Sequence, residues 1–100
     1  MKIEHLAIWV QDLESMRSFY EKYFKCNAGE KYTNHSKNFS SYFLTFNSGC
    51  RLELMHMPGI PKTKDDPISQ FSGLIHFAIS TGSKELVNQL TERLRSDGFK

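Results

Sequence analysis

Apolar residues recur along the chain with two different spacings, and both spacings occur near each end. Leu6, Ile8 and Val10 alternate with less apolar residues, which is the two-residue period of a β-strand with two unlike faces. Residues 74–80 (LIHFAIS) show the same alternation. The sequence therefore predicts a strand at 3–10 and another at 74–80.

A helical pattern follows each predicted strand. Asp12 and Ser83 stand just before these patterns, and their short side-chain oxygens favour N-caps. Asn27 and Gly98 stand at the ends, and both tolerate the left-handed conformation that often terminates a helix. Each helix carries one apolar stripe that we expect in the core. The stripes comprise Leu13, Met16, Phe19, Tyr20, Tyr23 and Phe24 in the first helix, and Leu86, Val87, Leu90 and Leu94 in the second.

The two strand–helix units are an internal repeat. When the chain is displaced by 71 positions, His5 falls on His76 and Glu14 falls on Glu85. The N-caps and the apolar positions of the helices coincide as well. The repeat predicts two related modules, each with one histidine on the less apolar face of its strand.

Three further strands are expected in the first module, at 27–32, 39–46 and 51–57, so residues 1–57 form a β-α-β-β-β module. Residues 58–73 hold all three prolines of the chain and are predicted to be a linker. Residues 74–100 begin a second module that stops after its strand and helix. The expected fold is α+β: a single domain, 1–100, of paired βαβββ modules around an open, cupped mixed sheet, with the second module truncated.

Composition excludes some classes of function. The net charge is only +2 and the charges are interleaved, which argues against nucleic-acid binding. No apolar run approaches the roughly 20 residues that a membrane span needs. Cys26 and Cys50 are isolated. They favour free thiols in a reducing cytoplasm, with a lone disulfide as the alternative. We therefore expect a cytoplasmic protein with neither a nucleic-acid nor a membrane partner.

Three side chains are candidate metal ligands. His5, Glu53 and His76 provide two imidazoles and one carboxylate on three predicted strands, a set that suits zinc, nickel, iron(II), cobalt or manganese. The alternative is that each is structural, with Glu53 paired to Arg51. The repeat favours the metal site, because modules related by a two-fold axis bring equivalent positions close together.

The chain resembles the vicinal oxygen chelate superfamily, which includes glyoxalase I and the fosfomycin and bleomycin resistance proteins. The resemblance is carried by residues 3–24 (IEHLAIWVQDLESMRSFYEKYF), by LELM around Glu53 and by LIHFAIS. The nearest branch is glyoxalase I-like. It implies a lactoylglutathione lyase-like lyase or isomerase acting on a small oxygen-chelating substrate through an enediolate-type intermediate. It also implies one divalent transition metal (Ni, Zn, Mn, Co or Fe) on His5, Glu53 and His76, with Glu53 as the candidate catalytic residue.

Two departures from the glyoxalase I pattern shape this expectation. The family's fourth ligand would fall beyond Lys100, and Trp9 stands where glyoxalase I often has an arginine that helps to hold glutathione. Trp9 favours a flatter or more apolar ligand if it lines the site; the alternative is that it fills the core. The rival interpretation is a metal-free small-molecule binding protein of the bleomycin-resistance type, with Trp9, Tyr42 and Phe43 as the substrate-binding walls.

Truncation of the second module has a consequence for assembly. Without further strands, the second helix and the strand that contains His76 would expose an apolar face and an unpaired edge. Either the chain is part of a longer protein, or a second copy covers these surfaces. We expect a homodimer.

Overall fold

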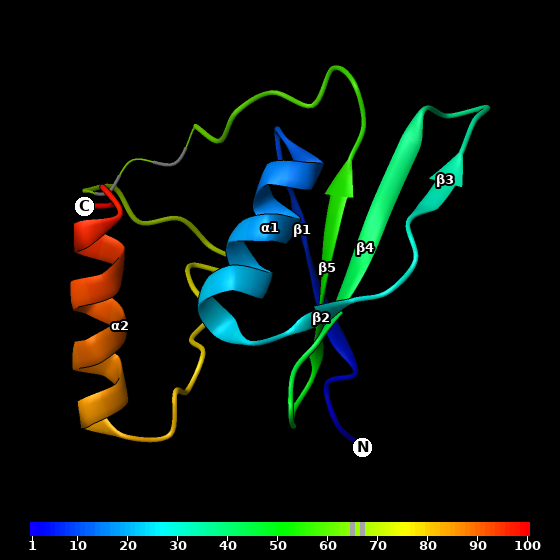
Figure 1. Cartoon of the computed structure of the whole chain (residues 1–100). Helices are drawn as coiled ribbons and strands as arrows, with labels where there is room; N and C mark the ends of the chain where they lie inside the picture. Colours follow the sequence, from blue (N-terminus) through cyan, green and yellow to red (C-terminus); the bar gives the residue numbers. More distant parts are fainter. Residues whose placement is uncertain (65, 67) are drawn as a thin grey trace. The chain divides into compact units, whose positions relative to one another are not determined.

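The computed structural model of the chain describes residues 1–64, 66 and 68–100 (Figure 1). Asp65 and Pro67, both in the predicted linker, lie outside the described residues. The chain divides into two compact units, Met1–Lys62 and Thr63–Lys100, and each is described by itself. The predicted α+β class is confirmed.

The first unit is a βαβββ module. The second predicted strand is split into β2 and β3, which are separated by residues 29–31. Both pieces pair antiparallel with β4. The elements are β1 (His5–Trp9), α1 (Leu13–Phe24), β2 (Asn27–Ala28), β3 (Tyr32–Asn34), β4 (Phe39–Thr45) and β5 (Arg51–His56).

The sheet is open and mixed, with the order β1-β5-β4-β2 and with β3 also paired to β4. β1 runs parallel to β5 and places Ala7 beside Glu53, whereas β4 runs antiparallel to β5 and places Phe43 beside Glu53. Since side chains alternate between the two faces of a strand, His5, Glu53 and Phe43 share one face.

Helix α1 covers the other face of the sheet and encloses the core (Figure 1). Leu44 and Leu54 are completely buried there, and burying a side chain of this size stabilises the fold by about 1.5–3 kcal/mol. Leu13, Tyr20 and Tyr23 of the predicted apolar stripe of α1 are also buried, and its other members, Met16, Phe19 and Phe24, are half-buried. We call the face that α1 leaves uncovered the distal face. Its side chains are those that point to the same side of the sheet as His5 on β1, Glu53 on β5 and Phe43 on β4.

The predicted N-cap of α1 is confirmed, but the predicted residue at its C-terminal end is not. Asp12 is the N-cap, and its side chain accepts a hydrogen bond of 3.0 Å from the amide of Ser15. The left-handed residue at the C-terminal end is Lys25, with φ of 52°, so the prediction for Asn27 was wrong. Asn27 instead begins β2, where pairing with Thr45 requires an extended backbone.

The second unit contains helix α2 (Lys84–Ser96), which is capped at both ends as predicted. The Ser83 hydroxyl accepts from the amide of Leu86 at 3.1 Å. Gly98 is left-handed, with φ of 94°, and the amide of Phe99 donates to the carbonyl of Leu94 at 2.9 Å. This is the Schellman arrangement, which satisfies carbonyls at the end of a helix.

The strand predicted at 74–80 is not formed. These residues have no regular secondary structure, and Leu74 and Ile75 are 69% and 63% exposed. A strand is stable only when a neighbour completes its hydrogen-bond ladder, and no described residue pairs with this segment. No residue of α2 is buried either, so the expected core role of its stripe is not met: Leu86 and Val87 are exposed, and Leu90 and Leu94 are half-buried.

The structure also describes the state of the two cysteines and the character of the two helices. Both cysteines are free, and Cys26 is buried while Cys50 is half-buried. Neither of the two described helices has the length and apolar character that crossing a bilayer requires.

Candidate functional site

His5 and Glu53 face each other on the distal face of the sheet. The parallel pairing of β1 with β5 brings their side chains together, and His5 Nε2 lies 3.8 Å from Glu53 Oε1. The Glu53 side chain is only 14% exposed, whereas that of His5 is 40% exposed. The pair therefore lies at a surface that a small ligand can reach.

The spacing of this pair fits a shared metal ion. Ligand distances of about 2.1 Å to a tetrahedral ion place two ligand atoms roughly 3.4 Å apart. The observed 3.8 Å is close to this value. An imidazole nitrogen and a carboxylate are also donors that divalent transition metals accept.

Arg51 pairs with Glu4 rather than with Glu53. Arg51 Nε donates to Glu4 Oε2 at 2.8 Å, and Arg51 Nη2 contacts the other oxygen. These hydrogen bonds from Arg51 lower the pKa of Glu4 to about 2, so this carboxylate is ionised throughout the neutral range. The structure therefore does not show the alternative ion pair between Arg51 and Glu53. Glu53 remains directed towards His5.

Phe43 packs against His5, and further aromatic rings lie elsewhere on the distal face. The Phe43 ring meets the His5 ring edge to face at 5.2 Å between centroids, and the Arg51 guanidinium lies 4.1 Å from the Phe43 centroid. Trp9, which is 45% exposed, meets Phe39 at 6.1 Å.

The aromatic surface extends beyond the residues that the sequence indicated. Phe39 also meets Tyr32 of β3 at 6.0 Å, so Trp9, Phe39 and Tyr32 form one row, which we call the aromatic row. Sequence reasoning missed Phe39 and Tyr32. The alternation of β4 places Phe39 on the same face as Phe43 and was a usable signal, but the pairing of β3 with β4 was not visible in the sequence.

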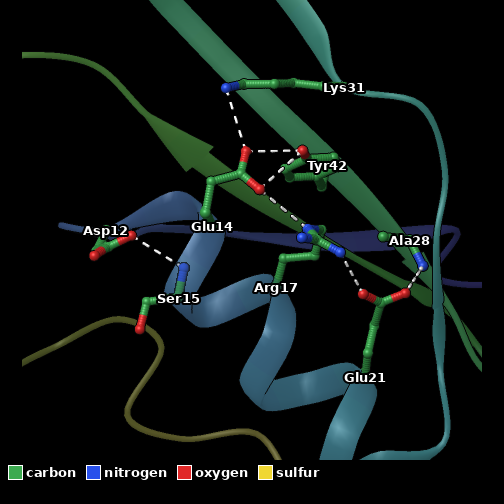
Figure 2. A network of polar contacts seen from close by, with 8 residues as sticks. All are labelled: Asp12, Glu14, Ser15, Arg17, Glu21, Ala28, Lys31 and Tyr42. Atoms are coloured by element: carbon green, nitrogen blue, oxygen red, sulfur yellow. Dashed lines mark hydrogen bonds and ion pairs between the residues drawn. The ribbon is translucent and has the colours of Figure 1, made fainter.

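Tyr42 lies on the opposite face of the sheet from Trp9 and Phe43. Figure 2 shows its hydroxyl beside Glu14 of α1, to which it donates at 2.8 Å. Glu14 also binds Lys31 at 3.3 Å and Arg17 at 3.2 Å. The structure thus places Tyr42 in a network that joins helix to sheet, apart from the other two aromatic residues predicted to bind substrate.

His76 belongs to the second unit and is exposed. Among the described residues, no three His, Cys, Asp or Glu side chains lie close enough together to hold a metal ion. The structure therefore brings together two of the three predicted ligands, His5 and Glu53. The third, His76, belongs to the other unit.

Comparison with known proteins places this geometry in a family. The model of the Glyoxalase/Bleomycin resistance protein/Dioxygenase superfamily matches residues 2–100. The chain belongs to this superfamily. Membership confirms the resemblance that the repeated strand–helix segments predicted, and it accounts for the βαβββ module and its open sheet. No curated protein sequence matches the chain.

Solved structures with this superfamily fold are similar over nearly the whole chain. A possible glyoxalase from Bacillus cereus is 30% identical with a TM-score of 0.70, and the match covers 100% of this chain and 77% of that one. The trypanothione-dependent glyoxalase I of Leishmania major is 23% identical with a TM-score of 0.74, over 97% and 66% of the two chains.

A third similar structure contains a metal. It is a mutant of the fosfomycin resistance protein FosX from Listeria monocytogenes in complex with Mn(II) and 1S,2S-dihydroxypropylphosphonic acid. It is 18% identical with a TM-score of 0.66, and the match covers 98% of this chain and 70% of that one. Together with the Leishmania enzyme, it shows that the superfamily fold is shared at low sequence identity.

Proposed function

We propose that this superfamily member is a glyoxalase-like, metal-dependent lyase or isomerase that acts on a small oxygen-chelating substrate, with a lactoylglutathione lyase-like reaction. The observation that carries the proposal is the His5–Glu53 pair, an imidazole nitrogen facing a carboxylate at 3.8 Å on the distal face. The membership of the superfamily, which includes metal-binding proteins such as FosX with Mn(II), supports it.

The residues that would hold the metal are His5, Glu53 and His76. The mixture of imidazole and carboxylate donors suits a divalent transition metal such as Ni, Zn, Mn, Co or Fe. Such an ion supplies a Lewis acid that polarises the oxygens of a bound substrate. His76 is part of this proposal through its place in the sequence repeat, since it corresponds to His5.

The protein side chains would supply binding and proton transfer. Glu53 is mostly shielded from solvent, and a shielded carboxylate beside the substrate is suited to accept a proton from carbon. The exposed rings of Trp9 and Tyr32 give an apolar surface on the same face, which would bind and orient the non-reacting part of the substrate. Phe43 packs against the ring of His5 and would help to hold its orientation.

A metal-free binding protein of the bleomycin-resistance type is the second candidate. The aromatic row of Trp9, Phe39 and Tyr32 favours it, because adjoining rings of which two are exposed can bind planar or apolar molecules without any metal. In that case Glu53 and His5 would contribute only polarity to the binding surface.

Metal content per chain tests the proposal. We expect close to one equivalent of a transition metal, measured by plasma mass spectrometry on protein purified without a histidine tag. The variants His5→Ala, Glu53→Gln and His76→Ala should each lose most of the metal, because each removes one of three ligands. Glu53→Gln preserves the size of the side chain and so separates loss of charge from loss of packing.

His35→Ala is the matched control for the histidine variants. His35 is exposed in the turn between β3 and β4, so its removal should leave the metal content unchanged. Wild-type protein without metal, even after incubation with nickel, zinc and manganese salts, would contradict the proposal and favour the metal-free binder. Retention of metal in His76→Ala alone would remove His76 from the site.

A further inference from the structure

We infer that Glu4 is the positioning residue of His5: its carboxylate, held by Arg51, binds the Nδ1 side of the imidazole and so directs Nε2 towards Glu53. No pattern in the sequence singles out Glu4, and it is not one of the proposed ligands. The inference rests on the proposed function, because it concerns the orientation of one proposed metal ligand.

The hydrogen-bonding chemistry of His5 decides which of its nitrogens carries the proton. His5 Nδ1 lies 3.3 Å from Glu4 Oε1. An ionised carboxylate only accepts hydrogen bonds, so the contact is favourable when Nδ1 bears the hydrogen. In the neutral imidazole, Nε2 then carries a free lone pair. A carboxylate partner on the far nitrogen is the usual device that orients a metal-binding histidine.

The opposite nitrogen faces another acceptor. Nε2 of His5 and Oε1 of Glu53 are 3.8 Å apart, and with the proton on Nδ1 neither atom offers a hydrogen to the other. Two electron-pair donors that face each other across this distance attract a cation between them. The Glu4 contact therefore prepares the His5–Glu53 pair for a positive ion, rather than for a hydrogen bond with each other.

Arg51 keeps the Glu4 carboxylate in place. Its guanidinium binds both Glu4 oxygens, and its backbone amide donates to the Glu4 carbonyl at 2.9 Å. The same guanidinium lies on the Phe43 ring, and Phe43 packs against His5. Glu4, Arg51, Phe43 and His5 thus form a closed ring of contacts, so that rotation of the imidazole would break contacts on two of its sides.

The test compares Glu4→Gln with Glu30→Gln. Both variants remove one negative charge from an exposed side chain of the first unit, but only Glu4 contacts His5. Two quantities are measured on the full chain: the affinity for Zn²⁺ alone, by competition with a chromogenic chelator, and the His5 tautomer. The tautomer is read from the imidazole nitrogen chemical shifts of metal-free protein at pH about 8.5, where an ordinary imidazole is neutral.

We expect wild-type protein and Glu30→Gln to show mainly the Nδ1–H tautomer. In Glu4→Gln the tautomer equilibrium of His5 should shift towards Nε2–H, and Zn²⁺ should bind about tenfold more weakly. We expect this lower end of the range for residues that support a metal ligand, because the Glu4 side chain is 55% exposed. A merely structural role for Glu4 would change neither the tautomer nor the affinity beyond the Glu30→Gln control.

The outcomes separate this inference from the proposed function. If wild-type protein binds Zn²⁺ and Glu4→Gln has the same affinity and the same tautomer, the inference about Glu4 is overturned. The proposed metal site is then still supported. Wild-type protein that binds no Zn²⁺ would overturn the metal site, while the tautomer would still decide the role of Glu4. If Glu4→Gln failed to fold, a predominant Nε2–H tautomer in the wild type would overturn the inference by itself.

Discussion

At the scale of single residues, the Tyr42 hydroxyl shows how one polar atom joins helix to sheet. Its hydrogen bond to Glu14 raises the pKa of Tyr42 and lowers that of Glu14, because the bond requires a neutral phenol and an ionised carboxylate. Its contribution to stability is therefore present at neutral pH. It is lost in acid, as the pH falls through the lowered pKa of Glu14, and in alkali, as the pH rises through the raised pKa of Tyr42.

Tyr42→Phe should lower the free energy of unfolding by about 0.5 kcal/mol, at the low end of the range for one hydrogen bond, because the bond is exposed to solvent. Urea denaturation at neutral pH measures this loss. Tyr32→Phe removes the same hydroxyl from a ring that is 56% exposed on the distal face, and it should leave the midpoint unchanged. Equal midpoints for the two variants would show that the Glu14 contact contributes nothing to stability.

At the scale of elements, α1 is stabilised by its N-cap and by the core that it covers. Asp12 satisfies one of the amides that have no partner inside the first turn, and the negative charge also interacts favourably with the helix dipole. The helix ends at Lys25, where the backbone turns left-handed so that the chain can enter β2. The start of α1 is thus set locally, whereas its end depends on the sheet.

Asp12→Ala should destabilise the protein by about 1 kcal/mol, since it removes the capping acceptor. Asp12→Asn keeps a side-chain oxygen at the same position and should cost only a small fraction of this. Thermal unfolding followed by circular dichroism compares the two variants. A similar loss in both would assign the effect to the charge of Asp12 and not to its hydrogen bond with Ser15.

At the scale of the whole molecule, the buried core belongs to the first unit. Its completely buried leucines, Leu44 and Leu54, lie between α1 and the sheet, whereas α2 has no buried residue and Leu86 is 43% exposed. The second unit therefore retains the apolar stripe of the repeat without the packing that the stripe serves in the first. The homodimer expected from the sequence stays a prediction.

Leu54→Ala should lower the free energy of unfolding by about 2–5 kcal/mol, because it leaves a cavity in the only described layer of buried leucines. Leu86→Ala makes the same chemical change on α2 and should alter stability by less than about 0.5 kcal/mol. Denaturation in urea measures both variants. A comparable loss for Leu86→Ala would show that its side chain is buried in solution by a surface that the structure does not describe.

The sequence by itself determined the elements that depend on local periodicity and capping. The strands β1, β4 and β5, the stripe of α1 and the caps Asp12, Ser83 and Gly98 were predicted, because each depends on residues a few positions apart. The superfamily was also recognisable, since its strand–helix segment occurs twice.

Only the tertiary structure decided which side chains meet. The register of β1 against β5 brings His5 to Glu53 and Arg51 to Glu4, and neither contact follows from the local pattern. Strand alternation already requires Tyr42 and Phe43 to lie on opposite faces, and the position of α1 decided which of the two lies on the distal face. The strand expected at 74–80 is absent for the same reason: a strand exists only where a neighbour completes its hydrogen bonds, and that neighbour is a property of the fold.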